Sequence, residues 1–234
     1  MTVLVAIHQP NYLPYIGFFN KMSLADLFVL YDTAQFSRNG FHNRNQLKTP
    51  RGRSWLTIPV HRPTQQEIRF IEIDQSKEWA AHHWQTIEAN YSRAAHFEDF
   101  RKDLRRLYAR PSQRFSETTE SFIGEFVRAF GIQTRIMRSS DLSPPEGLSP
   151  SSTLVEIVRL VGGDAYLSGP AGKDYLDPTA FTDVRLMVQD FHHPEYPQLW
   201  GPFEPNLSAM DLLLNTGSEA ADILANSGTA RPWP

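Results

Sequence analysis

Residues 8–19, HQPNYLPYIGFF, place several hydrogen-bonding side chains directly after a short apolar run. His8, Gln9, Asn11 and Tyr12 would bring an imidazole, two amides and a phenol to the point where that run ends. A histidine there can bind a phosphate or transfer a proton, and the free N–H groups at the start of a following helix also favour an anion. We therefore predict that His8 is catalytic and that Gln9, Asn11 and Tyr12 bind substrate. The alternative is a structural histidine in an ordinary turn.

The segment from residue 37 to residue 53 carries several cations and no acidic residue. Aromatic and amide side chains are interleaved with these charges. Uncompensated positive charge of this kind is typical of a segment that binds phosphate, a nucleotide or RNA, although a solvated surface loop has the same composition. The residues of this segment that we predict to contact substrate are Arg38, His42, Asn43, Arg44 and Lys48.

A glycine-containing stretch, SGPAGKDYLD at residues 168–177, is the third candidate. Its small residues would let backbone N–H groups approach an anion, and Lys173 would supply a countercharge. The stretch is not a Walker A motif, because its glycines are too close together and Asp174 follows the lysine. Lys173 is predicted to be catalytic, and the loop could otherwise be a simple turn. The substrate contacts predicted here are Ser168, Gly169, Gly172 and Tyr175.

The proline- and aromatic-rich stretch at residues 192–211 is typical of a rigid, packed substrate loop. His193, Asn206 and Ser208 are predicted to bind substrate there, although either of the last two residues can instead be the N-cap of the helix that follows. The two adjacent histidine pairs of the chain, at 82–83 and 192–193, lack the i, i+4 spacing of a helical zinc site. No metal site is therefore predicted.

The elements that must position these residues alternate between strands and helices. Short apolar, β-branched runs predict strands at 3–8, 27–31, 55–60, 68–73, 134–139, 165–169 and 186–191. Helical periodicity predicts helices at 15–25, 77–91, 96–109, 116–131, 153–163 and 207–217, with a short one from residue 218. This alternation predicts an α/β fold with a largely parallel sheet, and a single domain over 1–234 with a helical insertion or cap at 77–131.

Parallel strands present their carboxyl ends at one edge of a sheet, where ligands bind in open α/β folds. His8, Asp32 and the Ser168–Gly169 pair all fall at predicted strand ends. We therefore expect these residues to lie at one site. There Asp32 would be a third catalytic residue that orients His8 or activates an amine.

Composition narrows the classes of protein. The chain has 234 residues, of which 41% are hydrophobic and 21% charged, with a net charge of −3 and no cysteine. These values are ordinary for a globular domain and exclude thiolate chemistry and a generally basic nucleic-acid binder. Neither a membrane span nor a signal peptide is recognisable, so we expect a cytoplasmic protein without membrane insertion.

Several segments taken together resemble the WbqC-like family. The resemblance covers residues 5–217, and its pieces are HQPNYLPYIGFFNKM, ADLFVLYDTAQFSRNGFHNRNQLK, WLTIPV, YLSGPAGKDYLD and FHHPEYPQLWGPFEPNLSAMDLLLNTG. The family takes its name from genes of bacterial surface-polysaccharide (O-antigen) clusters. The resemblance therefore implies a role in polysaccharide or related biosynthesis.

The first strand, the His8 turn, the helix with Gly17 and ADLFVLYDTAQF are also similar to the opening of pantothenate synthetase and other HIGH-type nucleotidylyltransferases. That resemblance implies a Rossmann-like (HUP) sheet and contact between His8 and nucleotide phosphates. The chain departs from the pattern in having one histidine where those enzymes have two, since no histidine follows Gly17. The departure counts against direct adenylyl transfer.

These patterns favour a transferase that acts on an activated phosphate-bearing substrate, such as a nucleotide-linked amino sugar or an aminoacyl donor. Acyl and nucleotidyl transfer both stay open, the oligomeric state is undetermined, and a nucleotide is expected as a substrate rather than as a resident cofactor. The first alternative is a binding protein for a nucleotide or for RNA, including aminoacyl-tRNA, with Phe41 and Trp55 for stacking. The second is a scaffold in a biosynthetic complex.

Overall fold

The structure is a computed structural model that describes residues 2–37, 40–61 and 66–234. Its main sheet has six strands in the order β5-β2-β1-β6-β7-β8. The strands of this sheet are β1 (Leu4–His8), β2 (Leu27–Leu30), β5 (Arg135–Arg138), β6 (Ala165–Ser168), β7 (Arg185–Phe191) and β8 (Gly228–Pro232). The helices are α1 (Ile16–Ser23), α2 (Trp79–Tyr91), α3 (Phe97–Ala109), α4 (Phe115–Ala129), α5 (Pro150–Leu160), α6 (Ala209–Thr216) and α7 (Glu219–Ala225).

The connectivity of the sheet is doubly wound. The chain starts at central β1, moves outward through β2 to β5, and then returns to β6 on the other side of β1 and continues to β7. These five strands pair in parallel, and β8 closes the edge in the antiparallel direction. This arrangement confirms the predicted α/β class with a largely parallel, Rossmann-like sheet. It also creates a topological switch point between the carboxyl ends of β1 and β6.

Successive side chains of β1 pack against helices on opposite faces of the sheet. Val5 and Ile7 pack with Val155 and Val158 of α5 in one hydrophobic cluster. Ala6 belongs to a larger cluster on the opposite face, together with side chains of α1, α6 and α7. A strand covered on both faces must be apolar at successive positions, as the run VLVAI is.

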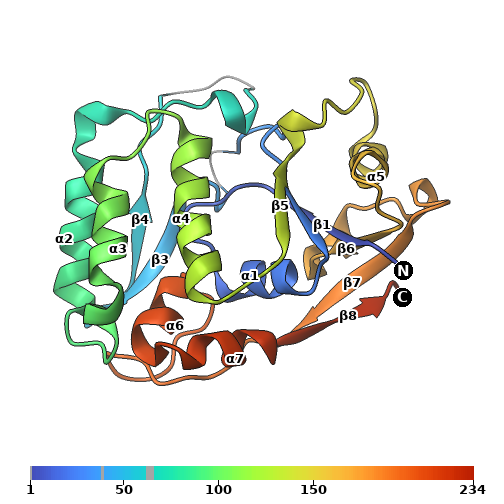
Figure 1. Cartoon of the computed structure of the whole chain (residues 1–234). Coiled ribbons are helices and arrows are strands. Elements are labelled where there is room, and N and C mark those ends of the chain that lie inside the picture. The colour runs from blue at the N-terminus through green and yellow to red at the C-terminus, as the bar shows by residue number, and fades with distance from the viewer. Residues whose placement is uncertain (1, 38–39, 62–65) are drawn as a thin grey trace.

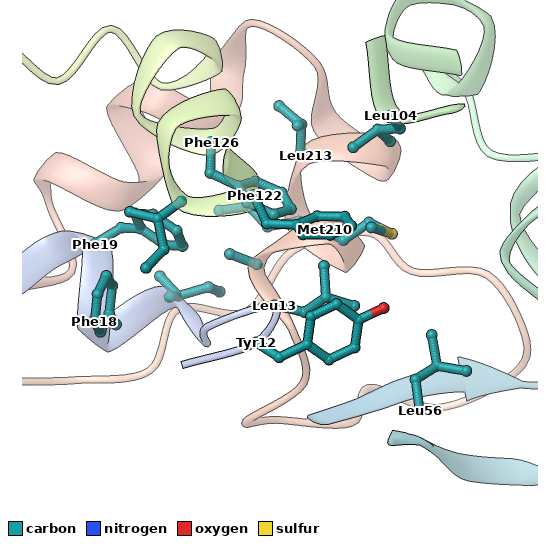
Figure 2. Packing of buried hydrophobic residues seen from close by; sticks show 14 of the residues in the cluster. Tyr12, Leu13, Phe18, Phe19, Leu56, Leu104, Phe122, Phe126, Met210 and Leu213 are labelled. Carbon is teal, nitrogen blue, oxygen red and sulfur yellow. The ribbon is translucent and has the colours of Figure 1, made fainter. Parts of the chain in front are cut away.

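Helices α2, α3 and α4 form the predicted insertion, which stands to one side of the sheet next to a separate two-stranded hairpin (Figure 1). The insertion and the sheet share the larger hydrophobic cluster. Within it, Tyr12 and Leu13 lie near Phe122 of α4 and Met210 of α6 (Figure 2). The turn after β1 is therefore the link between the sheet and the insertion. No helix in the described part of the chain is long and apolar enough to span a membrane.

The structure corrects one strand prediction and adds two strands that were not predicted. Residues 68–73, predicted as a strand, begin with the 3-10 helix Ile68–Phe70 and continue as isolated bridges, because Ile68 and Ile71 are buried at a helical spacing. The basic segment folds into β3 (Arg44–Thr49), which pairs with β4 (Gly52–Thr57) in the hairpin. Neither β3 nor β8 shows an apolar strand pattern, because both are short and mainly polar.

Candidate functional site

Two adjoining cavities open at the carboxyl ends of the parallel strands. The switch-point cavity, of about 520 Å³, lies between β1 and β6. Its walls include His8, Gln9, Tyr15, Lys21, Gly169 and Tyr175. The amide-lined cavity, of about 860 Å³, lies between the turn after β1, the hairpin and the segment before α6. Six of its lining residues carry side-chain amides, namely Gln9, Asn11, Gln35, Asn45, Gln46 and Asn206. His8, Gln9, Tyr15 and Ala171 line both cavities and form the border between them.

His8 ends β1 and stands on this border. Its Nδ1 lies 2.9 Å from the carbonyl oxygen of Gln9, so in the neutral ring Nδ1–H donates and Nε2 is left as an acceptor. Burial, together with the charge of Lys21 and the neighbouring His42, lowers the pKa of His8 to about 3. The free imidazole is therefore neutral, and a bound anion would raise its pKa from this low starting value.

Lys21, in the last turn of α1, is the main functional candidate that the sequence analysis missed. It is 4% exposed and lines the switch-point cavity, where Nζ donates a hydrogen bond to the carbonyl oxygen of Ile7 at 3.0 Å. Burial lowers its pKa from 10.5 to about 7, and no carboxylate of the described residues pairs with it. The sequence does contain a signal for Lys21, because its neighbours in the helix are apolar and buried. Lysine is almost never fully buried without a partner, so a lysine in such a helix is a candidate for a functional role.

Tyr15 separates the two cavities because Gly17 lets its ring lie against α1. A Cβ atom on Gly17 would come within 2.5 Å of the Tyr15 ring. Tyr15 also precedes α1 as its N-cap residue and forms an isolated bridge with Ser208. Burial raises the pKa of the Tyr15 phenol, which therefore stays protonated as a hydrogen-bond donor at neutral pH.

His42 is a second imidazole at the candidate site. It is buried beside Phe36, and its Nδ1 accepts a hydrogen bond from the Ser37 backbone N–H. Burial lowers its pKa. His42 lines the amide-lined cavity together with His8. His42 belongs to the segment before β3, whereas His8 ends β1.

The loop after β6 contributes Gly169, Gly172 and Tyr175 to the switch-point cavity. Gly172 is required for packing, because a Cβ atom there would meet Ser168 Oγ at 1.9 Å. The Gly172 N–H donates to the Gly169 carbonyl, so it is not free to hold an anion. Ser168 itself is buried and donates to the Gly169 carbonyl. Lys173 is exposed and is not among the described residues that line the cavity.

Tyr12 and Asp32 lie elsewhere than expected. The Tyr12 hydroxyl is in the core, 2.9 Å from His83 Nδ1 and 2.7 Å from the Tyr108 hydroxyl. Asp32 is 2% exposed, and its carboxylate accepts hydrogen bonds from Ser139 and Ser140. These bonds hold the end of β2 to the segment after β5, and Asp32 is not among the described residues that line either cavity.

The hairpin places the predicted cations of the basic segment apart from one another. Lys48 is buried, and its Nζ donates to Gln198 and to the Pro202 carbonyl, so it ties the hairpin to the 192–205 loop. The Arg44 guanidinium lies over the Trp55 ring at 4.6 Å. Asn43 is buried and donates to the Ile58 carbonyl. Neither cavity has any of these three among its described lining residues, and Arg38 lies outside the described residues.

The stretch before α6 also divides into a cavity residue and structural residues. Asn206 lines the amide-lined cavity. His193 uses both ring nitrogens locally, because Nδ1–H donates to the Pro194 carbonyl and Nε2 accepts from the Asn206 N–H. Ser208 is the N-cap of α6, with its Oγ accepting from the Met210 N–H. Among the described residues, no group of three or more His, Asp or Glu side chains is arranged to hold a metal ion.

The strand order and the cavity at its switch point define a doubly wound α/β protein with its candidate site at the usual ligand-binding edge. The chain belongs to the WbqC-like protein family, whose model matches residues 9–223. It is also 35% identical over 226 residues to the uncharacterized protein Rv1507c of Mycobacterium tuberculosis, an alignment covering 94% of this chain and 96% of that protein. No solved structure matches the chain.

Proposed function

We propose that this protein is a transferase that binds an activated, phosphate-bearing substrate in the switch-point cavity. The observation that carries the proposal is the buried ammonium of Lys21, which lines this cavity beside His8 without a carboxylate partner. The substrate classes are a nucleotide-linked amino sugar and an aminoacyl donor. The proposed setting is bacterial surface-polysaccharide or related biosynthesis, as the family resemblance implies.

The charge and shape of the cavity support an anion with a planar group attached. An unpaired buried charge costs several kcal/mol, on the order of the penalty for a desolvated ion, and a ligand phosphate would supply the missing partner. No acidic side chain is among the described lining residues, so a phosphate would meet no repulsion there. The walls include the aromatic rings of Tyr31, Tyr166 and Tyr175, which are suited to contact a base or another flat group.

We assign the transfer step to the border between the two cavities. An acceptor hydroxyl or amine would form a bond to the carbonyl carbon of an acyl donor, or to the phosphorus of a nucleotidyl donor. The bond from that atom to a phosphate oxygen breaks, and the electron pair leaves on the phosphate, where Lys21 offsets the charge. The acceptor proton moves to His8 Nε2, whose basicity rises once the anion is bound.

RNA binding through the basic segment is the alternative function. Phe41 and Trp55 support it, because these rings are 56% and 43% exposed and lie 5.8 Å apart. The hairpin offers less free charge than the sequence suggests, since Lys48 is buried and Arg53 pairs with Glu204 at 2.7 Å. A protein that binds aminoacyl-tRNA would lose affinity steeply with salt, whereas small-nucleotide binding in a cavity would respond weakly. A scaffold would bind neither ligand.

A thermal-shift screen with nucleotides, nucleotide sugars and an aminoacyl-adenylate analogue tests the proposed function. A ligand that binds the native state raises the apparent melting temperature. We expect a shift with wild-type protein and with Lys102→Met, which removes an exposed lysine from α3, and no shift with Lys21→Met. Circular dichroism and the unliganded melting temperature show whether Lys21→Met is folded, and Lys21→Arg tests whether a cation alone suffices.

Two outcomes would contradict the proposed function. Either no phosphate-bearing ligand of the screen raises the melting temperature, or a ligand raises the melting temperatures of wild-type and folded Lys21→Met protein equally. Salt-sensitive tRNA binding without a nucleotide shift would favour the RNA-binding alternative instead.

A further inference from the structure

We propose that the amide-lined cavity binds an uncharged, polyhydroxylated molecule, a sugar, and that this sugar is the acceptor of the transfer. The acceptor role rests on the proposed function, whereas sugar binding at this cavity does not. Five residues with side-chain amides line this cavity, and they come from the turn after β1, the segment after β2, the hairpin and the segment before α6: Gln9, Asn11, Gln35, Gln46 and Asn206.

The amides are available to a ligand. Asn45 is the structural member of the set, because its Nδ2 donates to the Leu13 carbonyl and its Oδ1 accepts from the Gln46 N–H. The side-chain amides of the other five form no hydrogen bond with the described residues. One of them, Asn11, has a buried Oδ1 without a partner. Buried polar atoms are rarely left unsatisfied, so Asn11 has an unused acceptor, which a ligand donor can reach once the side chain turns into the cavity.

The charge of the cavity selects a neutral ligand. Its described lining residues include no Asp or Glu, and their one arginine, Arg53, already pairs with Glu204. Both histidines have lowered pKa values, mainly because they are buried, and are neutral at pH 7. A phosphate or carboxylate ligand would therefore find no free countercharge here, in contrast to the switch-point cavity with Lys21.

The hydrogen-bonding pattern favours a sugar over other neutral ligands. Each amide offers both a donor and an acceptor, and each sugar hydroxyl does the same, so one amide can bond two adjacent hydroxyls. The residues that carry these amides come from four separate segments of the chain, which suits a ligand with several hydroxyl groups. The half-exposed Phe41 ring also lines the cavity and would cover the apolar C–H face of a sugar. A volume of about 860 Å³ is within the usual range of ligand sites.

Saturation-transfer NMR and titration with glucose, galactose and N-acetylglucosamine test this inference, with glucuronate and glucosamine as charged analogues. We expect neutral sugars to bind, with glucuronate no tighter than glucose. Gln46→Leu removes a side-chain amide that forms no hydrogen bond within the described part of the protein, since the hydrogen bonds of Gln46 are made by its backbone atoms. Asn206→Gly removes a second amide, and glycine tolerates the left-handed backbone of residue 206, whose φ is 59°. Each variant should weaken binding by about tenfold, the effect of one lost hydrogen bond. Gln85→Leu, on the exposed side of α2, should have no effect.

Two results would overturn sugar binding at this cavity: no neutral sugar of the panel binds at millimolar concentration, or Gln46→Leu and Asn206→Gly bind sugar as wild type does. Tighter binding of glucuronate would also contradict it, because it would show a free cation. Failure of this inference differs from failure of the proposed function, since a nucleotide shift that depends on Lys21 would still be observed if only the sugar assignment were wrong.

Discussion

Lys21 donates a hydrogen bond to the carbonyl oxygen of Ile7, the residue next to His8, so the ammonium and the imidazole line the same cavity. Burial lowers the pKa of both groups, and the charge on Lys21 lowers that of His8 further. Neither group has an acidic partner among the described residues. An anion bound between them would stabilise the charged form of both, which couples ligand binding to proton uptake.

The first prediction is that this coupling appears as a pH-dependent affinity. A nucleotide sugar is the suitable probe because its phosphodiester groups stay ionised throughout the range. The pKa of Lys21 is lowered to about 7 in the free protein. Above that pH, binding must add a proton to Lys21, so affinity should fall as the pH rises from 7 to 9. Calorimetry in two buffers of different ionisation enthalpy measures the proton uptake directly.

Lys102→Met should follow the wild-type pH profile in this experiment, because Lys102 is an exposed residue of α3. Residual binding by Lys21→Met should be weak and nearly independent of pH in the same range. A wild-type affinity that stays flat between pH 7 and 9 would show that the ligand phosphate does not contact Lys21.

The second prediction concerns the free energy of unfolding of Lys21→Met. The Lys21 pKa falls from 10.5 in the unfolded chain to about 7 in the folded one. Between these values the unfolded chain binds more protons, so wild-type protein gains stability relative to the variant as the pH rises. Below pH 7 the lysine is charged in both states, and its buried charge carries its full cost. Lys21→Met should therefore be more stable than wild type by about 1–4 kcal/mol at pH 6.

Urea denaturation at pH 6, 8 and 10 measures this difference, which should shrink as the pH rises. Lys102→Met supplies the comparison for a lysine whose charge stays in water. A stability difference that is the same at all three pH values would mean that folding does not lower the pKa of Lys21.

The third prediction is that Tyr12 contributes to stability and not to ligand binding, unlike the cavity residues next to it. Tyr12→Phe removes a hydroxyl that lies within hydrogen-bond distance of His83 and Tyr108 in the core. Leaving these two groups without their partner should cost about 1–3 kcal/mol of unfolding free energy. Binding of nucleotide and sugar should be unchanged, since Tyr12 is not among the described lining residues of either cavity. Loss of ligand affinity without loss of stability would show that Tyr12 contacts substrate.

Tyr12 and its neighbours also show what the sequence could and could not predict. The apolar runs at 3–8, 27–31 and 165–169 predicted central strands, because strands buried on both faces have that composition. Once these strands are parallel, their ends must meet, so the common position of His8 and Gly169 followed from the sequence. The direction of each side chain in the turn did not. Asn11 faces a cavity and Tyr12 the core, and that choice depends on α2–α4, which pack against the turn.

The two missed contributions have the same origin. Lys21 lies in a helix that reads as apolar, and its place at the site results from the approach of α1 to the end of β1. The amides of Gln35 and Gln46 are ordinary surface residues in sequence and gather at one cavity through folding of the hairpin. Conversely, the charge of Lys48 suggested phosphate binding, but the 192–205 loop covers it. Tertiary contacts decide these positions, and local pattern does not encode them.

The fourth prediction tests how Gly17 positions Tyr15 on the border of the cavities. Gly17→Ala places a methyl group within 2.5 Å of the Tyr15 ring, which must move, so both nucleotide and sugar binding should weaken. The clash is with one side chain only, whereas alanine is the better helix former by about 1 kcal/mol. In a Tyr15→Ala background, Gly17→Ala should therefore be neutral or stabilising. A double-mutant cycle of unfolding free energies measures this coupling, and additive effects would show that Tyr15 does not lie against Gly17 in solution.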